Sequence, residues 1–125
     1  MEQIDIELLE VAYRLIREVG DTENQPVSAA VRTAEGDIVT GVNLAHFTGG
    51  PCAEVVALAN VAAAGTTAQT IVAVSANTLL PPCGRCRQIM IDYWPQVNLV
   101  VPDADGQPVN VAIRDLLPFA YLANE

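Results

Sequence analysis

The sequence predicts an α/β fold in which one mixed sheet carries helices on both of its faces. Segments with the 3.6-residue periodicity of helices alternate along the chain with short runs rich in valine and small residues, which are typical of strands. Two of these runs, residues 70–76 and 97–102, are apolar at most positions. Such runs indicate strands that are buried between two layers of helices.

The first element is an amphipathic helix that ends at Gly20. Its apolar residues recur at helical spacing with charged residues between them, at Ile4, Leu8, Val11, Leu15 and Val19. Residues 26–33 and 37–44 then predict two short strands joined by a turn at "AEGD", which favours a hairpin.

The remaining elements alternate between helix and strand. Residues 52–64 are apolar nearly all round, which predicts a buried helix. Residues 83–94 predict a second helix, which is stopped by Pro95. The other segments follow in chain order: a loop at 46–51, a strand at 70–76, a loop at 77–82, a strand at 97–102, a turn at 103–108, a short strand at 109–113, a helical turn at 114–118 and a tail from 119.

Composition favours one soluble domain that spans residues 1–125. Hydrophobic residues make up 51% of the chain and charged residues 17%, so there is ample material for a core. No apolar run approaches the roughly 20 residues that span a membrane. The start "MEQIDIELLE" carries acids where a signal peptide carries basic residues. We therefore expect a cytoplasmic protein without a membrane partner.

The net charge of −9 argues against nucleic acid as a partner, because phosphate binding needs a basic surface. A small neutral or cationic substrate suits this balance better than a polyanion. The acids also fit a simpler interpretation, in which they only keep the protein soluble.

The three cysteines, Cys52, Cys83 and Cys86, predict a zinc site. An odd number of thiols does not form a disulfide scaffold. Each of the two cysteine-containing stretches opens a predicted helix after a proline, and a helix N-terminus favours the thiolate that binds metal. Cys83 and Cys86 are three residues apart and share a helical face. Three sulfurs would hold one zinc ion and leave a fourth position for water.

Glu54 is the candidate catalytic residue beside this site. It lies two positions after Cys52, so it can overhang the open position without binding the metal, and a carboxylate there can move the proton of an activated water. A ligand, one residue, a glutamate and a later P-C-x-x-C are the pattern of zinc-dependent base deaminases. Arg87 can donate a hydrogen bond to a thiolate and offset its charge.

Two other interpretations of the cysteines remain open. His46 can serve as a fourth ligand of a closed structural zinc site, and such a site would make the chain an interaction module rather than an enzyme. The C-x-x-C stretch at 83–86 also fits a redox pair, which would leave Cys52 and Glu54 unexplained.

Beyond these residues, the chain resembles the cytidine deaminase superfamily and, within it, the blasticidin S deaminases. The matching stretches are "TGVN", "HFTGGPCAE", "PPCGRCRQ", "DGQP" and "LLP", and the resemblance runs from Val27 to Tyr121. It implies a three-layer α/β/α sandwich with a five-stranded mixed sheet. It also implies a homotetramer whose subunits help to close each other's sites.

The resemblance implies that a cytosine nucleoside is deaminated to the uracil form, with one zinc per chain held by the three cysteines and Glu54 as the proton shuttle. Blasticidin S or a related nucleoside is the first expectation, which would make the chain an antibiotic-resistance enzyme, and cytidine or deoxycytidine is the second. The substrate-contacting positions that it implies are Gln25, Ser28, Asn43, Ala53, Pro81 and Tyr121. Phe47, an aromatic residue in the loop before Cys52, is a further candidate to line the pocket. In relatives, a serine stands at Gln25, a glutamate at Ala45 in nucleoside deaminases, and a tryptophan at Ala123.

Overall fold

The computed structural model describes residues 3–123 and has the α/β architecture that the sequence predicts. The helices are α1 (Ile6–Val19), α2 (Ala53–Ala63), α3 (Gly84–Tyr93) and the short α4 (Ile113–Leu116). The strands are β1 (Ser28–Thr33), β2 (Ile38–Val42), β3 (Ala68–Val74), β4 (Leu79–Leu80), β5 (Asn98–Pro102) and β6 (Pro108–Ala112).

Five strands form the continuous path of a mixed sheet in the order β2-β1-β3-β5-β6. β3 and β5 pair in parallel, and the other neighbours along this path pair antiparallel. The predicted hairpin is β1–β2, in which Ser28 lies opposite Val42 and Arg32 opposite Ile38. The two strands predicted to be most deeply buried, β3 and β5, lie next to each other at the centre.

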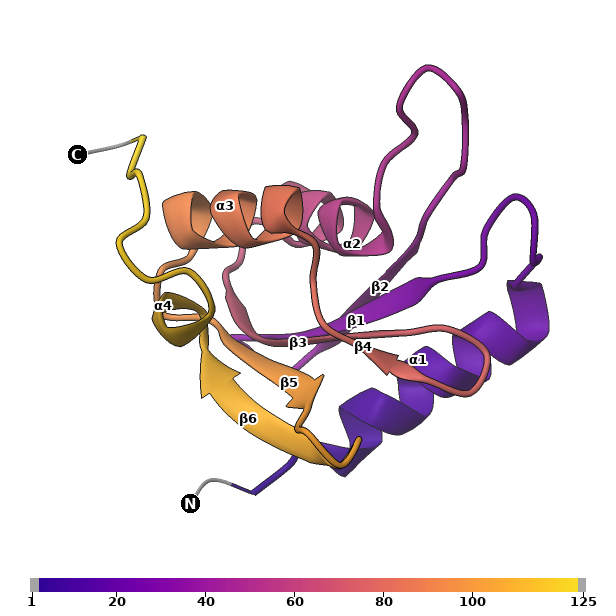
Figure 1. The fold of residues 1–125 in the computed structure, drawn as a ribbon, viewed down its shortest axis with the longest axis horizontal. Helices are drawn as coiled ribbons and strands as arrows, with labels where there is room; N and C mark the ends of the chain where they lie inside the picture. Colours follow the sequence, from indigo (N-terminus) through magenta and orange to yellow (C-terminus); the bar gives the residue numbers. More distant parts are fainter. Residues whose placement is uncertain (1–2, 124–125) are drawn as a thin grey trace.

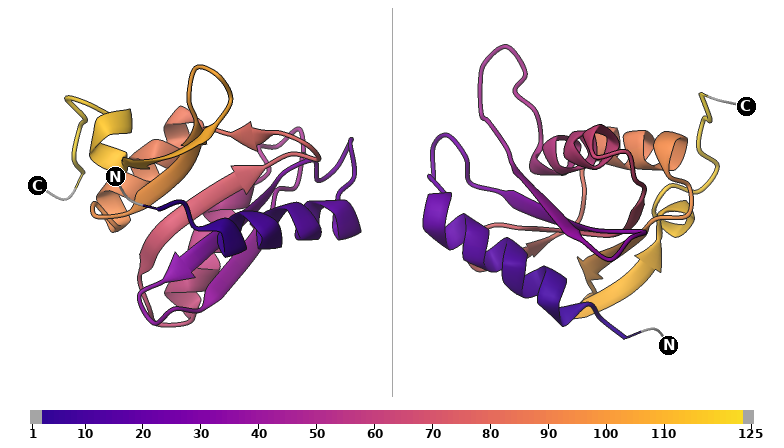
Figure 2. Two further views of the ribbon diagram at one scale, coloured as in Figure 1. Left: turned by 90° about the horizontal axis from the view of Figure 1, so that it is seen from below. Right: turned by 180° about the vertical axis from the view of Figure 1, so that it is seen from behind.

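Helices cover both faces of this sheet, so the molecule has the three layers that the resemblance implies (Figures 1 and 2). α1 lies on one face and packs its residues Leu8, Ala12 and Ile16 against β1, β3 and β5. α2 and α3 lie side by side on the opposite face, over a second and larger apolar cluster. The N-termini of α2 and α3 are thereby held on the same side of one rigid sheet.

The buried face of α1 differs from the predicted stripe. Leu8, Ala12 and Ile16 are buried, whereas Val19 is 44% exposed. The i, i+4, i+8 spacing of the buried residues places them in one row, and the small Ala12 lets the helix approach the sheet. The stripe predicted from the sequence relied instead on larger apolar residues, which flank this row.

The predicted loop at 77–82 was wrong in part, because Leu79 and Leu80 form the short strand β4. They pair antiparallel with Val74 and Ala73 at the end of β3, after a turn in which the Ser75 N–H donates to the Thr78 carbonyl. A two-residue strand is too short for periodicity to reveal. This short hairpin carries the chain back across the sheet to Pro82 and Cys83.

α2 packs closely on β2 because Gly41 has no side chain. A Cβ atom at Gly41 would lie 2.5 Å from the Ala57 nitrogen and 2.9 Å from the Ala53 carbonyl oxygen, closer than atoms pack. Any larger residue would push α2, and the cysteine at its N-terminus, away from the sheet. None of the helices between residues 3 and 123 is both long and apolar enough to cross a membrane.

Candidate active site

Three thiols converge where α2 and α3 begin, as the sequence predicts. Cys52 is the N-cap of α2, Cys83 is the N-cap of α3, and Cys86 lies in the first turn of α3. The Sγ atoms of Cys52 and Cys83 are 3.8 Å apart, those of Cys83 and Cys86 are 3.4 Å apart, and all three lie within 4.8 Å of one another. All three thiols are free.

This spacing fits a zinc ion. Zinc–sulfur bonds of about 2.3 Å at tetrahedral angles place two sulfur ligands about 3.8 Å apart. The group of side chains close enough to share a metal consists of Cys52, Cys83 and Cys86, and within the described residues it does not include His46. The His46 Nδ1 atom instead bonds to Thr48. The alternative of a closed site with His46 as the fourth ligand is therefore not supported by the geometry.

The three thiols differ in their electrostatic surroundings. Burial raises the pKa of Cys86 and Cys52, and the nearby negative charge of Glu54 raises both further. Burial also opposes ionisation of Cys83, but the backbone N–H groups of Cys86 and Arg85 and the neighbouring thiols outweigh it, so the pKa of Cys83 is lowered. Buried thiols whose ionisation is unfavourable need a cation to become thiolates together.

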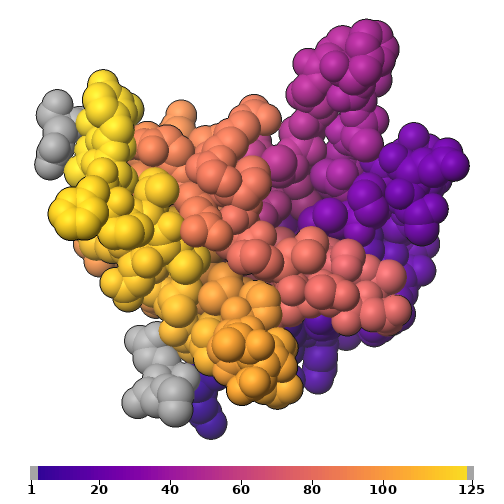
Figure 3. Space-filling view, viewed as in Figure 1, coloured from indigo at the N-terminus to yellow at the C-terminus, as the bar shows by residue number. Residues whose placement is uncertain are grey.

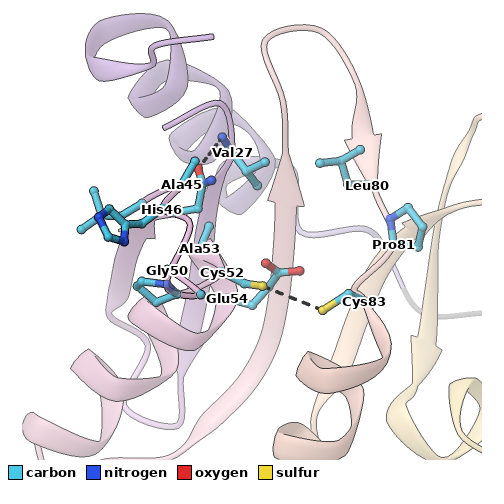
Figure 4. A pocket seen from close by; sticks show the side chains of 14 residues that line it. Val27, Ala45, His46, Gly50, Cys52, Ala53, Glu54, Leu80, Pro81 and Cys83 are labelled. Carbon is cyan, nitrogen blue, oxygen red and sulfur yellow. Dashed lines mark hydrogen bonds between the residues drawn. The ribbon is translucent and has the colours of Figure 1, made fainter. Parts of the chain in front are cut away.

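Glu54 lies in the first turn of α2, with its carboxylate beside the Cys52 and Cys83 sulfurs (Figure 4). The residue is only 6% exposed, and this burial raises the pKa of its carboxyl group above the usual value. No hydrogen bond joins this carboxylate to another side chain in the described part of the chain. A carboxyl group that is desolvated and turned to a pocket is suited to accept and donate protons near neutral pH.

Arg87 does not hold a sulfur, contrary to the prediction. Its Nε atom donates to the Pro82 carbonyl at 2.9 Å and its Nη1 atom donates to the Leu116 carbonyl at 2.9 Å. The guanidinium therefore ties the residue before Cys83 to the end of α4. It positions the N-terminus of α3 through the backbone and makes no direct contact with a thiolate among the described residues.

A pocket of about 450 Å³ opens beside the thiols and Glu54. Three predicted substrate contacts, Asn43, Ala53 and Pro81, line it. Asn43 is fixed in orientation, because its Oδ1 atom accepts a hydrogen bond from the Val27 N–H at 2.9 Å. Its NH2 group is thereby left to donate to a bound molecule.

The other four predicted substrate contacts lie outside this pocket. Ser28 is fully buried against α1, where its hydroxyl donates to the Ala12 carbonyl, and the Gln25 side chain donates to the Val19 carbonyl. Both side chains therefore lie on the face of the sheet that α1 covers and not in the pocket. Phe47 and Tyr121 are 95% and 79% exposed, so within one chain neither closes the pocket.

Sequence reasoning placed the loop before Cys52 at the pocket but did not foresee Val27 and Leu80, nor the parts that Leu44 and Ala45 take in the pocket wall. Val27 lies just before β1 and Leu80 lies in β4, so their proximity to Cys52 depends on how the sheet is assembled. The glycines of "TGGP" were the available signal for the loop. A Cβ atom at Gly50 would lie 1.7 Å from the Leu44 carbonyl oxygen, which shows how tightly the loop closes at its base.

A family model described as the cytidine and deoxycytidylate deaminase zinc-binding region matches residues 2–101 of the chain. The match includes all three cysteines and Glu54. It covers most of the chain and extends from the start of the sequence to the end of the central strands.

Individual proteins are similar over comparable lengths. The chain is 31% identical to blasticidin-S deaminase of Bacillus cereus, over 99% of this chain and 96% of the relative. It is 31% identical to cytidine deaminase of Halalkalibacterium halodurans, over 79% of each protein. The crystal structure of cytidine deaminase from Burkholderia pseudomallei superposes with a TM-score of 0.76 at 30% identity, over 95% of this chain and all of that one.

Proposed function

Because the chain belongs to the cytidine and deoxycytidylate deaminase family of zinc enzymes, we propose that it deaminates the cytosine moiety of blasticidin S or a related nucleoside. The reaction replaces the exocyclic amine by oxygen, consumes one water and releases ammonia. The observation that carries the proposal is the convergence of three thiols, two of which line the same pocket as a buried carboxylate.

Cys52, Cys83 and Cys86 are the zinc ligands in this proposal. Zinc, when bound, acts as a Lewis acid that lowers the pKa of water to about 7. The open side of the three thiols faces the pocket, where Glu54 lies. The N-termini of α2 and α3 direct partial positive charge at the same place and offset the negative charge of three thiolates.

Glu54 is the proton shuttle. Its carboxylate takes a proton from the attacking water and delivers it to the ring nitrogen next to the reacting carbon. It then takes the second proton of that water from the new hydroxyl group on this carbon and passes it to the amine, which leaves as ammonia while the carbonyl forms. The raised pKa of Glu54 supports this role, because its carboxylate is then a stronger base toward the attacking water and holds the proton long enough to pass it on. Backbone groups near Ala53 and Pro81 orient the base, and the Asn43 amide donates to the group attached to it.

Blasticidin S is the first choice of substrate because a blasticidin-S deaminase is 31% identical to this chain over 99% of its length. Ala45 stands where nucleoside deaminases carry a glutamate, which weakens recognition of ribose. Cytidine or deoxycytidine is the second candidate. It is favoured by the presence of Asn43 in the pocket and by the similarity to cytidine deaminases.

One assay separates these candidates. Purified protein of measured zinc content is given blasticidin S, cytidine and 2′-deoxycytidine separately, and ammonia release is followed for each. We expect kcat/KM to be highest for blasticidin S. A higher kcat/KM for cytidine would move the assignment to pyrimidine salvage, and no ammonia from any of them would reject the deaminase. Cells that express the chain in their cytoplasm should also grow in blasticidin S.

The proposal includes a homotetramer in which neighbouring chains complete the sites. Its support is the outer face of α2 and α3, where an apolar groove of about 460 Å³ is lined by Val55, Leu58, Ala59, Ala62, Ile89, Tyr93 and Trp94. The loop that carries Phe47 and the tail that carries Tyr121 project on either side of this hollowed face (Figure 3). Light scattering after size exclusion should give four times the mass of one chain, and a monomeric mass would contradict it.

A further inference from the structure

Among residues 3–123, the side chains in the outer part of the pocket offer hydrogen-bond donors and no free acceptor. The polar side chains that line the pocket are Asn43, His46, Cys52, Glu54 and Cys83. Three of these form the reaction centre. Asn43 uses its Oδ1 atom to accept from the Val27 N–H, so it offers its NH2 group. His46 is therefore the side chain whose role in the pocket is unassigned.

The loop fixes both the position and the tautomer of His46. The Thr48 backbone N–H donates to the His46 Nδ1 atom at 3.1 Å, and the Thr48 hydroxyl bonds to the same nitrogen. A backbone N–H is always a donor, so Nδ1 carries no proton. In the neutral ring the proton then lies on Nε2. Within residues 3–123 no hydrogen bond engages Nε2. His46 is an exposed residue at the rim of the pocket, so this nitrogen can bond to a ligand.

The backbone holds this arrangement before any substrate binds. The Leu44 N–H donates to the Pro51 carbonyl and the Gly49 N–H donates to the His46 carbonyl, which closes the loop into a compact turn. The ring of Phe47 packs against the imidazole with centroids 4.5 Å apart. Figure 4 shows His46 on the side of the pocket opposite Leu80 and Pro81, beyond Cys52 and Glu54.

We propose that His46 is a specificity-determining residue, whose Nε2–H donates to an oxygen of the group attached to the cytosine base. The inference rests on the proposed function, since the base must occupy the inner pocket with its substituent toward the rim. Ala45 leaves no carboxylate beside His46 to recognise sugar hydroxyls as donors. The rim accordingly selects substituents by their acceptor oxygens, from a hydroxyl or from an anionic group.

The test compares two variants on substrates with and without that substituent. In His46→Gln, the amide NH2 reaches nearly to the place of Nε2 and keeps a donor there. In His46→Asn, the shorter side chain reaches only to the place of Nδ1. The probes are 2′-deoxycytidine, deoxycytidylate and 1-methylcytosine, which lacks the substituent.

We expect His46→Asn to lower the ratio of kcat/KM on 2′-deoxycytidine to kcat/KM on 1-methylcytosine by about tenfold, mainly through KM, as loss of one hydrogen bond predicts. His46→Gln should keep the ratio within about threefold of the wild type. A larger loss on deoxycytidylate would identify the phosphate as the accepting group, and an equal loss would identify the sugar.

Two results would overturn the inference while leaving the deaminase intact: an unchanged ratio in His46→Asn, or equal losses in both variants, which would indicate shape and not a donor. If the wild type releases no ammonia, the proposed function fails. Binding of the same probes to zinc-loaded protein, measured by calorimetry, then tests whether His46 contacts the nucleoside. A tenfold weaker Kd for the nucleoside in His46→Asn supports the inference, and an unchanged Kd, or no binding by the wild type, rejects it.

Discussion

The three long helices begin in two different ways. α1 begins with a conventional cap, in which Asp5 accepts a hydrogen bond from the Leu8 N–H at 3.1 Å. α2 and α3 begin with cysteines, and neither Cys52 nor Cys83 makes a side-chain cap hydrogen bond. The first turn of α1 is satisfied within the chain, whereas the first turns of α2 and α3 keep N–H groups directed at the thiols.

This difference separates a helix start that serves stability from two that serve chemistry. An aspartate cap contributes about 1 kcal/mol to the stability of a helix. The cysteine caps forgo this contribution, but the positive N-termini of α2 and α3 then stabilise thiolates and, with them, a metal ion. The starts of α2 and α3 also differ from each other, because the first turn of α2 carries Glu54 and that of α3 carries no acidic residue.

Glu54→Gln should have the largest effect, and it tests whether Glu54 moves protons while the cysteines hold the metal. The substitution keeps the size of the side chain but removes its ability to carry a proton, so kcat/KM should fall about 100- to 10,000-fold. Zinc content, measured by mass spectrometry of the native protein, should stay at one per chain because Glu54 is not a ligand. Glu10→Gln, an exposed change on α1, is the matched control. Loss of zinc in Glu54→Gln would contradict the separate roles.

Removing the metal should destabilise the helix starts of α2 and α3 and not that of α1. With free zinc 1,000-fold above its Kd, binding adds about 4 kcal/mol to the free energy of unfolding. A chelator should therefore lower the melting temperature of the wild type, and Cys86→Ala should have a low melting temperature that the chelator does not change. Glu54→Gln serves as the control that keeps the chelator response. An equal response in Cys86→Ala would mean that Cys86 is no ligand.

The same comparison explains which features the sequence could reveal. Cysteines after prolines at the start of predicted helices identified Cys52, Cys83 and Cys86, because a helix N-terminus is a local property with a clear signature. The strands β3 and β5 were recognisable because burial on both faces leaves a continuous apolar run. The convergence of the three cysteines and the central sheet were therefore predictable from short stretches alone.

Features that depend on distant parts of the chain were not predictable. Ser28 was expected at the substrate, yet its strand directs it to Ala12 on α1. Arg87 was expected to bond a neighbouring sulfur, yet it reaches the Leu116 carbonyl, 29 residues further along the chain. Neither residue type nor spacing indicates which face or which distant carbonyl a side chain will meet, since the packing of α1 and α4 decides it.

Arg87→Ala should weaken zinc binding without removing a ligand. The guanidinium fixes the Pro82 carbonyl next to Cys83, so its loss should loosen that ligand and reduce zinc affinity about tenfold or more, as loss of groups that orient ligands usually does. Competition with a chelator of known affinity measures this change. Arg85→Ala is the matched control, because Arg85 is exposed on the same helix turn. Equal affinities in both variants would remove Arg87 from the site.

The smallest expected effect belongs to the conventional cap of α1. Asp5 bonds to Arg32 as well as to the Leu8 N–H, and the hydrogen bonds from Arg32 are the main reason why the pKa of Asp5 lies below its usual value. Asp5→Ala removes both interactions and should cost about 1 kcal/mol, measured by urea unfolding at pH 6. Asp5→Asn keeps a capping side chain and loses only the charge, so it should cost less.

These two variants also differ in their dependence on pH. A lowered pKa in the folded state means that the Asp5 carboxylate stabilises the fold above about pH 4, the usual pKa of an unfolded aspartate, and that this contribution is lost as the pH falls through the folded pKa. The difference in stability between the wild type and Asp5→Asn should therefore shrink as the pH falls below about 4 and should close once the pH lies below the folded pKa of Asp5. Chelated protein is needed for this measurement, because acid also releases zinc from thiolates. If the difference in stability stayed constant from pH 6 to pH 3, Asp5 would stabilise the start of α1 through its shape alone and not through its charge.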